Sequence, residues 1–171
     1  AYQSWGDQRT IAEMTQRIIV DAADALGRRQ FDSADGEIDL DGEWTWLAVY
    51  DAVSDVVGEE ITPDTPRETL LKHLDAREVV YNPALSDGKL VMELFAELVE
   101  PTLIQPTFVC DFPAIAQPLA RPHRDDPRKV EAWDLIIGGM ERGTGFSELI
   151  DPVIQREILT QQSLAAAAGD P

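Results

Sequence analysis

The stretch Glu131–Glu157, EAWDLIIGGMERGTGFSELIDPVIQRE, decides the fold. Apolar residues alternate from Trp133 to Ile137, which predicts a β-strand, and the following Gly138-Gly139 pair is typical of a two-residue hairpin loop. Asp134, Glu141 and Glu148 follow one another at intervals of seven residues, a spacing that would fit a helix. The glycines that lie between these acids argue strongly against one. The stretch therefore predicts a β-hairpin.

The register of this hairpin determines which acidic side chains meet. With the glycine pair as the loop, Ile136 faces Glu141, and Asp134 faces Gly143. Asp134 and Glu141 then become diagonal neighbours on one face, roughly 7–8 Å apart at the backbone. Two carboxylates at that separation can share one divalent cation, although solvated strand charges are the commoner role of exposed acids. The third acid, Glu148, shares their face only if a bulge at one of the later glycines shifts the register.

The rest of the chain shows helical signals first and strand signals late. Helix starts, amphipathic periodicity and turn dipeptides locate these elements. The sequence predicts helices over 10–26, 46–57, 66–77, 87–100 and 152–164, a hairpin over 30–40 and a strand over 107–111. This order, with hairpin connections in place of crossovers, favours an α+β fold with an antiparallel β-sheet flanked by helices.

Composition restricts the classes of partner and compartment. The 171 residues suit one domain, and no apolar run is long enough to indicate a membrane span. Cys110 is the only cysteine, which rules out an internal disulfide and fits a reducing cytoplasm. The net charge of −18, with only 14 basic residues, opposes a strong grip on a nucleic-acid backbone. Plain solubility is the simplest explanation of this acidity.

Three motifs together carry a resemblance to a known family. The hairpin with its GFSEL strand, the stretch Glu100–Pro113 (EPTLIQPTFVCDFP) and the turn Pro118–Ala120 (PLA) resemble the catalytic domain of class II lysyl-tRNA synthetases, closest to the actinobacterial branch. The opening AYQSWGDQ resembles the segment after the second signature motif, and QSLAAAAGDP the segment before the third. Residues 1–171 are therefore expected to be a partial class II catalytic domain, lying between these two motifs.

The resemblance implies a function, a cofactor and partners. A lysine–tRNA ligase activates lysine with ATP and passes the lysyl group to tRNA, which would be bound mainly by regions outside this chain. Asp134 and Glu141 match the acids that hold Mg²⁺ against the ATP phosphates, although the family often has glutamate at Asp134. The resemblance also implies a cytoplasmic homodimer for the complete enzyme. It assigns no catalytic residue here, and the isolated chain is expected to be inactive because the arginines of both motifs lie outside it.

Four further residues match positions that contact lysine in the family. Glu148 would meet the side-chain ammonium, Phe146 would pack on the aliphatic stem, and Tyr2 would supply a hydroxyl nearby. Thr144 stands where many members have asparagine, which puts its contact to the amino acid in question. On sequence alone, core aromatics are the better explanation of Phe146 and Tyr2.

Two alternatives to a tRNA ligase remain open from the sequence. One is a related ligase that transfers lysine to a protein side chain or a lipid. The other is a non-catalytic, truncated interaction module. Flanking regions would separate these alternatives, because an anticodon-binding barrel favours the tRNA ligase and a membrane region favours lipid lysylation.

Overall fold

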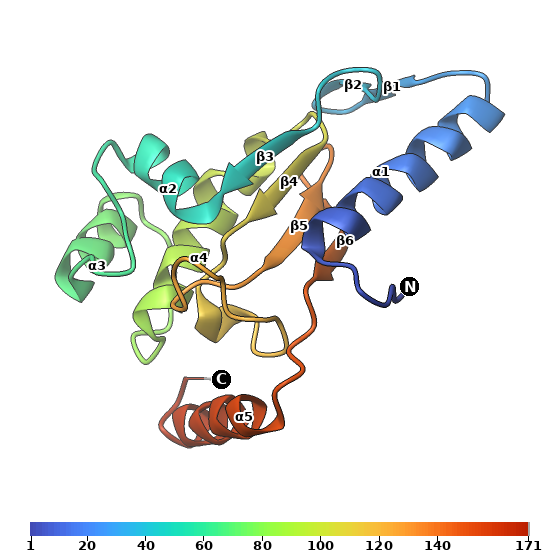
Figure 1. Ribbon diagram of the computed structural model, residues 1–171. Coiled ribbons are helices and arrows are strands. Elements are labelled where there is room, and N and C mark those ends of the chain that lie inside the picture. The colour runs from blue at the N-terminus through green and yellow to red at the C-terminus, as the bar shows by residue number, and fades with distance from the viewer. Residues whose placement is uncertain (171) are drawn as a thin grey trace.

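A computed structural model describes residues 1–170, and its centre is a four-stranded sheet in the order β3-β4-β5-β6. Helix α1 covers one face of this sheet, and α2, α3 and α4 form a layer on the other (Figure 1). A separate two-stranded hairpin, β1-β2, lies beyond the end of α1. Helices and hairpins in these layers confirm the predicted α+β class.

The elements have the following bounds. The helices are α1 (Gln8–Ala25), α2 (Val49–Val57), α3 (Arg67–Ala76), α4 (Asp87–Leu98) and α5 (Pro152–Ala167), with short 3-10 turns η1 (Glu100–Thr102) and η2 (Ala114–Ala116). The strands are β1 (Gln30–Ser33), β2 (Gly36–Asp39), β3 (Thr45–Ala48), β4 (Thr107–Cys110), β5 (Ala132–Ile136) and β6 (Glu141–Phe146).

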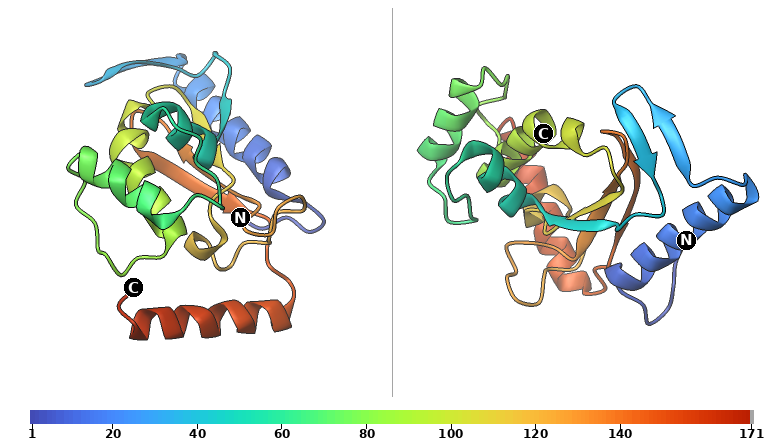
Figure 2. Two further views of the ribbon diagram at one scale, coloured as in Figure 1. Left: turned by 90° about the vertical axis from the view of Figure 1, so that its left-hand side faces the viewer. Right: turned by 90° about the horizontal axis from the view of Figure 1, so that it is seen from above.

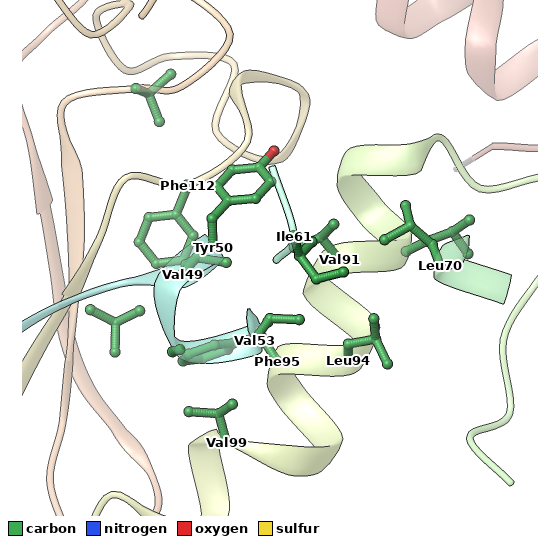
Figure 3. Packing of buried hydrophobic residues seen from close by; sticks show 14 of the residues in the cluster. Val49, Tyr50, Val53, Ile61, Leu70, Val91, Leu94, Phe95, Val99 and Phe112 are labelled. Carbon is green, nitrogen blue, oxygen red and sulfur yellow. The ribbon is translucent and has the colours of Figure 1, made fainter. Parts of the chain in front are cut away.

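Side chains that alternate along the central strands build two separate cores. On the helical-layer side, Val109 and Ile136 pack against apolar residues of α2 and α4, including Val53 and Phe95 (Figure 3). On the opposite side, Phe108, Cys110, Trp133 and Leu135 pack under α1. Successive residues within each strand therefore face different cores, and Asp134, which pairs with Val109, is on the side of the helical layer.

The start of the predicted helix 46–57 is wrong, because Thr45–Ala48 is strand β3 and α2 begins only at Val49. Trp46 pairs with Phe108 of β4, and the two rings stack with centroids 5.0 Å apart. The pairing is parallel, so the sheet is mixed, whereas an antiparallel sheet was expected. The β4–β5 and β5–β6 pairs are antiparallel, as predicted.

Helix α1 begins earlier than its sequence signal indicates. Asp7, rather than Thr10, is the N-cap, and its carboxylate accepts hydrogen bonds from the backbone N–H groups of Arg9 and Thr10. Gly27, just past the helix end, has the left-handed backbone (φ 71°) expected of a terminating glycine. The segment before α1 is therefore anchored to the helix start by a charged cap.

Helix α5 lies across one end of the molecule, apart from the sheet (Figure 2, left). None of its residues is buried, but Asp170 beyond it is. The Asp170 carboxylate accepts hydrogen bonds from Lys89 Nζ at 2.7 Å and from the backbone N–H of Ser86 at 3.1 Å. These contacts attach the end of the described chain to the start of α4. Within residues 1–170, no helix has the length and apolar character needed to cross a bilayer.

Candidate functional site

The tip of the β5–β6 hairpin has the geometry that a glycine pair permits. Gly138 and Gly139 both have φ of +65°, which matches a turn with two left-handed residues. Their N–H groups donate to the carbonyls of Ile104 and Leu103 at 2.9 and 3.0 Å. A Cβ on Gly139 would lie 3.0 Å from the carbonyl oxygen of Pro101. The hairpin tip is thus docked on the segment that precedes β4.

The predicted register is correct for the pair beside the turn, but it is wrong further along the strands. Ile136 pairs with Glu141 as expected, but Asp134 pairs with Thr144, where Gly143 was predicted. The register shifts between Leu135 and Ile136, so Arg142 is the extra residue of a β-bulge. Arg142 comes one residue before Gly143, the first of the later glycines at which the sequence suggested a bulge.

Three carboxylates, those of Asp134, Glu141 and Glu100, lie close enough for electrostatic interaction on the turn side of this hairpin. Asp134 is half-buried, and burial is the main reason that its pKa rises to about 6. Hydrogen bonding by the Thr144 hydroxyl lowers the pKa of Asp134, whereas the charges of Glu141 and Glu100 raise it further. The pKa of Glu100 is raised by burial and then by Glu141. Glu100, at the start of the EPTLIQPTF stretch, was not selected from the sequence.

The donor chemistry of Asp134 and Glu141 fits Mg²⁺, which prefers oxygen ligands and is often held by one or two carboxylates plus phosphates and water. In the part of the chain that the structure describes, no group of three His, Cys, Asp or Glu side chains is arranged to hold a metal ion. The two acids therefore suit a site that substrate oxygens complete, rather than a closed protein cage.

A cavity of about 820 Å³ lies between the N-terminal segment, α1 and the end of β6. Its lining includes all four residues proposed to contact the amino acid, namely Tyr2, Thr144, Phe146 and Glu148. Asp134 and Glu141 are not part of that lining. Thr144 connects the two regions, because it lines the cavity and pairs with Asp134 across the hairpin.

The walls of this cavity differ in burial. The Tyr2 side of the cavity is open, with Tyr2 itself 94% exposed, so the core explanation for Tyr2 is wrong. Phe146 is half-buried and packs against the core of the helical layer. Glu148 is exposed, and its backbone bridges Ala120 of the PLA turn. No ion pair between Glu148 and Arg142 is found within residues 1–170. Arg142 instead donates a hydrogen bond to the Ile137 carbonyl at 3.1 Å.

Two arginines that sequence reasoning did not select also line the cavity. Arg121 and Arg124 come from the loop after the PLA turn, and both approach the buried carboxylate of Glu131. The only sequence signal for them is the density of charge in the loop 121–127. Because their partner precedes β5, the contacts depend on tertiary structure.

Two other residues can be placed outside this region. Cys110 is buried, and burial raises its pKa to about 12. His73 is buried and lies 2.9 Å from Glu59 and 3.1 Å from Arg77. His73 therefore has a structural polar environment on α3, away from the cavity.

Comparison with known families adds the decisive observation. A family model described as tRNA synthetases class II (D, K and N) matches residues 1–170. The chain belongs to this family. Both the class of fold and the position of the hairpin agree with the resemblance that the three motifs carry.

Among individual proteins, the chain is similar to lysine–tRNA ligases and to a protein of lysyl-lipid synthesis. The chain is 45% identical over 172 residues to a lysine–tRNA ligase of Kineococcus radiotolerans, and 48% identical over 173 residues to one of Mycolicibacterium gilvum. Each alignment covers 99% of this chain and 34% of the relative, so the chain spans about a third of these ligases. It is also 42% identical over 177 residues to the lysylphosphatidylglycerol biosynthesis bifunctional protein LysX of Mycobacterium avium, covering 15% of that protein.

Proposed function

We propose that residues 1–171 form the central part of the catalytic domain of a lysine–tRNA ligase, between its second and third signature motifs. The reaction is ATP-dependent activation of lysine, followed by transfer of the lysyl group to tRNA. The single observation that carries this proposal is one cavity that gathers Tyr2, Thr144, Phe146 and Glu148 next to the carboxylates of the hairpin. The identity to lysine–tRNA ligases supports lysine as the amino acid.

The lysine side chain has two chemically distinct parts, and the cavity offers a partner for each. The carboxylate of Glu148 accepts charge-assisted hydrogen bonds from the ammonium group. The Phe146 ring, two residues earlier on the same strand face, covers the methylene stem. Tyr2, across the cavity, offers a hydroxyl near the ammonium group of lysine. A neutral side chain of similar length would leave Glu148 without its cation.

On this proposal, Asp134 and Glu141 would hold Mg²⁺ on one face of the hairpin, together with ATP phosphates. When bound, the ion would supply neutralisation of phosphate charge and help to orient the α-phosphate. Glu141 is the more secure ligand, because Asp134 is one methylene shorter than the glutamate often found there. The charges of Glu141 and Glu100, which add to the main effect of burial in raising the pKa of Asp134, support the assignment because they make a cation favourable there.

Catalysis by this segment is positioning and charge stabilisation, with no covalent enzyme intermediate. The lysine carboxylate attacks the α-phosphate and pyrophosphate leaves, so the chain's task is to fix the amino acid while the phosphates are held. A net charge of −18 supports placing most of the tRNA contacts in other parts of the ligase. A cytoplasmic homodimer is part of the same proposal.

The test is lysine-dependent exchange of pyrophosphate into ATP, measured in a full-length protein that carries this chain within the length of the ligase relatives. We expect exchange with lysine and none with neutral amino acids of similar size. Formation of lysyl-tRNA in a second assay would support the acceptor. Absence of lysine-dependent exchange in a folded preparation would overturn the proposal.

The similarity to LysX favours one second candidate, in which lysine is transferred onward to a lipid. Activation of lysine is the same in both cases, so exchange alone does not separate them. The measurement is incubation with radiolabelled lysine, ATP, tRNA and phosphatidylglycerol vesicles. Label in the lipid fraction would favour the second candidate, whereas label in tRNA alone would favour the first.

A further inference from the structure

The two walls of the cavity come from opposite ends of the chain, and a buried polar network joins them. Tyr2 belongs to the segment before α1, whereas Phe146 is the last residue of β6 and Glu148 follows it. Ser147, 2% exposed, lies between these last two residues, and its Oγ accepts the backbone N–H of Gln8 at 3.0 Å. This bond attaches the start of α1 directly to the residue before Glu148.

Glu131 lies at the centre of this network. It is 4% exposed, and its backbone carbonyl accepts the N–H of Ser147 at 2.8 Å. Its backbone N–H donates to the Arg121 carbonyl, and the Arg121 N–H donates to the Ser147 carbonyl, both at 2.8 Å. The main chain of Glu131 therefore fixes the residue immediately before Glu148.

The Glu131 side chain extends the network to the other wall. Its Oε1 forms an ion pair with Nε of Arg124 at 2.7 Å. The same guanidinium lies 4.0 Å from the carboxylate of Asp7, the residue that caps α1. Arg124 is thus held between an acid beside β5 and an acid beside the N-terminal segment, and it lines the cavity.

The buried Glu131 carboxylate and its two arginines are not an arrangement that stability alone would favour. A buried carboxylate is costly to desolvate, and ion pairing offsets that cost only when the remaining lone pairs are also satisfied. The Oε2 atom of Glu131 makes no hydrogen bond within residues 1–170, and NH1 of Arg121 is 3.9 Å away from it. A charge kept under these conditions is better explained by the orientation that it imposes on Arg124.

We propose that Glu131 is a positioning residue for amino acid selection. Through Arg124 and Ser147, Glu131 holds the Glu148 wall at a fixed separation from the Tyr2 wall. The inference deepens the proposed function and rests on it, because it takes lysine as the ligand of this cavity. Glu131 itself does not touch the substrate, so its loss changes the fit of lysine without removing a contact.

The experiment compares Glu131→Gln with wild type in the full-length ligase, by lysine-dependent pyrophosphate exchange. We expect the KM for lysine to rise about tenfold, since small misplacements in a binding site have large effects, while kcat and the KM for ATP change less than about twofold. Arg124→Gln should raise the lysine KM similarly, and the double variant should add little, because the two residues act as one unit. Glu131→Asp keeps the charge and should recover part of the loss.

Asp126→Asn is the matched control. Asp126 forms an ion pair with Arg128 at 2.8 Å on the same loop, but neither residue lines the cavity. This variant should leave the lysine KM unchanged. If Glu131→Gln does not fold, Arg124→Gln still decides the matter, because that side chain is 65% exposed.

The outcomes separate this inference from the proposed function. Wild type without lysine-dependent exchange contradicts the proposed function. Active wild type with an unchanged lysine KM in both Glu131→Gln and Arg124→Gln overturns only the inference. A fall in thermal stability with no change in lysine KM would likewise overturn it, since that is the result of a purely structural role.

Discussion

Gly145 pairs with Trp133 across the hairpin, and a Cβ on Gly145 would lie 2.3 Å from Cζ2 of the indole. The ring occupies the space that any side chain at this position would need. Trp133 is 1% exposed, meets Phe108 edge to face at 5.0 Å, and donates through Nε1 to the Gln8 carbonyl at 2.8 Å. The bare backbone at Gly145 is therefore what allows the tryptophan to join the sheet to α1.

Gly145→Ala should destabilise the chain by about 1–3 kcal/mol, because the methyl group forces the buried indole or the strand to move. The free energy of unfolding from urea denaturation would measure this. Gly143→Ala is the control in the same strand, since nothing lies within 4 Å of its added Cβ. Equal destabilisation by the two substitutions would show that strand propensity, and not the indole contact, is responsible.

Glu141→Gln should slow magnesium-dependent adenylate formation at least tenfold, which is roughly 1.4 kcal/mol of transition-state stabilisation. The amide keeps the size of the side chain but loses the charge that the cation needs. Pyrophosphate exchange in the full-length ligase would be followed across a magnesium titration. Glu97→Gln, an exposed acid on α4, serves as the control. An unchanged titration curve for Glu141→Gln would remove this residue from the metal site.

Glu148→Gln should weaken the use of lysine by about 2 kcal/mol, the lower end of the range for a charged pair that loses one partner. The lower end applies because Glu148 is exposed in the absence of substrate. Lysine-dependent exchange would be measured together with the affinities for ATP and magnesium. Unchanged lysine affinity with a collapsed magnesium dependence would assign Glu148 to the metal site instead.

The purified 171-residue chain alone should show no lysine-dependent pyrophosphate exchange. The arginines expected from the second and third signature motifs are not among its residues, and Arg121 and Arg142 lie in other contexts. Losing preorganised charge contacts typically costs a hundredfold or more in rate for each contact. Exchange by a homogeneous preparation of this chain would contradict the prediction, and the full-length ligase provides the positive control.

Cys110 should resist thiol reagents in the native chain. Burial raises its pKa to about 12, so almost no thiolate is present at pH 8. A folded-state pKa above the unfolded value stabilises the native chain below about pH 9, and this contribution is lost as the pH rises toward 12. Labelling by a chromogenic disulfide reagent, with and without urea, would measure this. Rapid labelling of the native chain would show that the thiol is accessible after all.

The hairpin could be predicted because its signals are local. Alternating apolar residues and the Gly138-Gly139 pair fix the strands, the turn and the first pair of the register. The bulge at Arg142 could not be predicted, because nothing near it in sequence distinguishes it from its neighbours. It results from pairing with β5 and from the bond that Arg142 donates to the Ile137 carbonyl.

Strand β3 was missed for the opposite reason. The residues from Trp46 onward have a pattern that is compatible with a helix, and only the distant strand β4 makes the first of them extended. The candidate site shows the same division. Tyr2, Thr144, Phe146 and Glu148 followed from family motifs, and the structure brings them to one cavity. The Glu131 network depends on contacts between distant segments, which no local pattern encodes.

The parallel pairing of β3 with β4 has a consequence for how the chain folds. All of α2, α3 and α4 lies between these strands in the sequence, so a long loop must close before they can pair. The β5–β6 hairpin needs only a two-residue turn and can form within microseconds. Until β3 arrives, one edge of β4 stays open to strands of other chains, which is a route to aggregation. Refolding yield should therefore fall with protein concentration more steeply than the stability of the native chain would indicate.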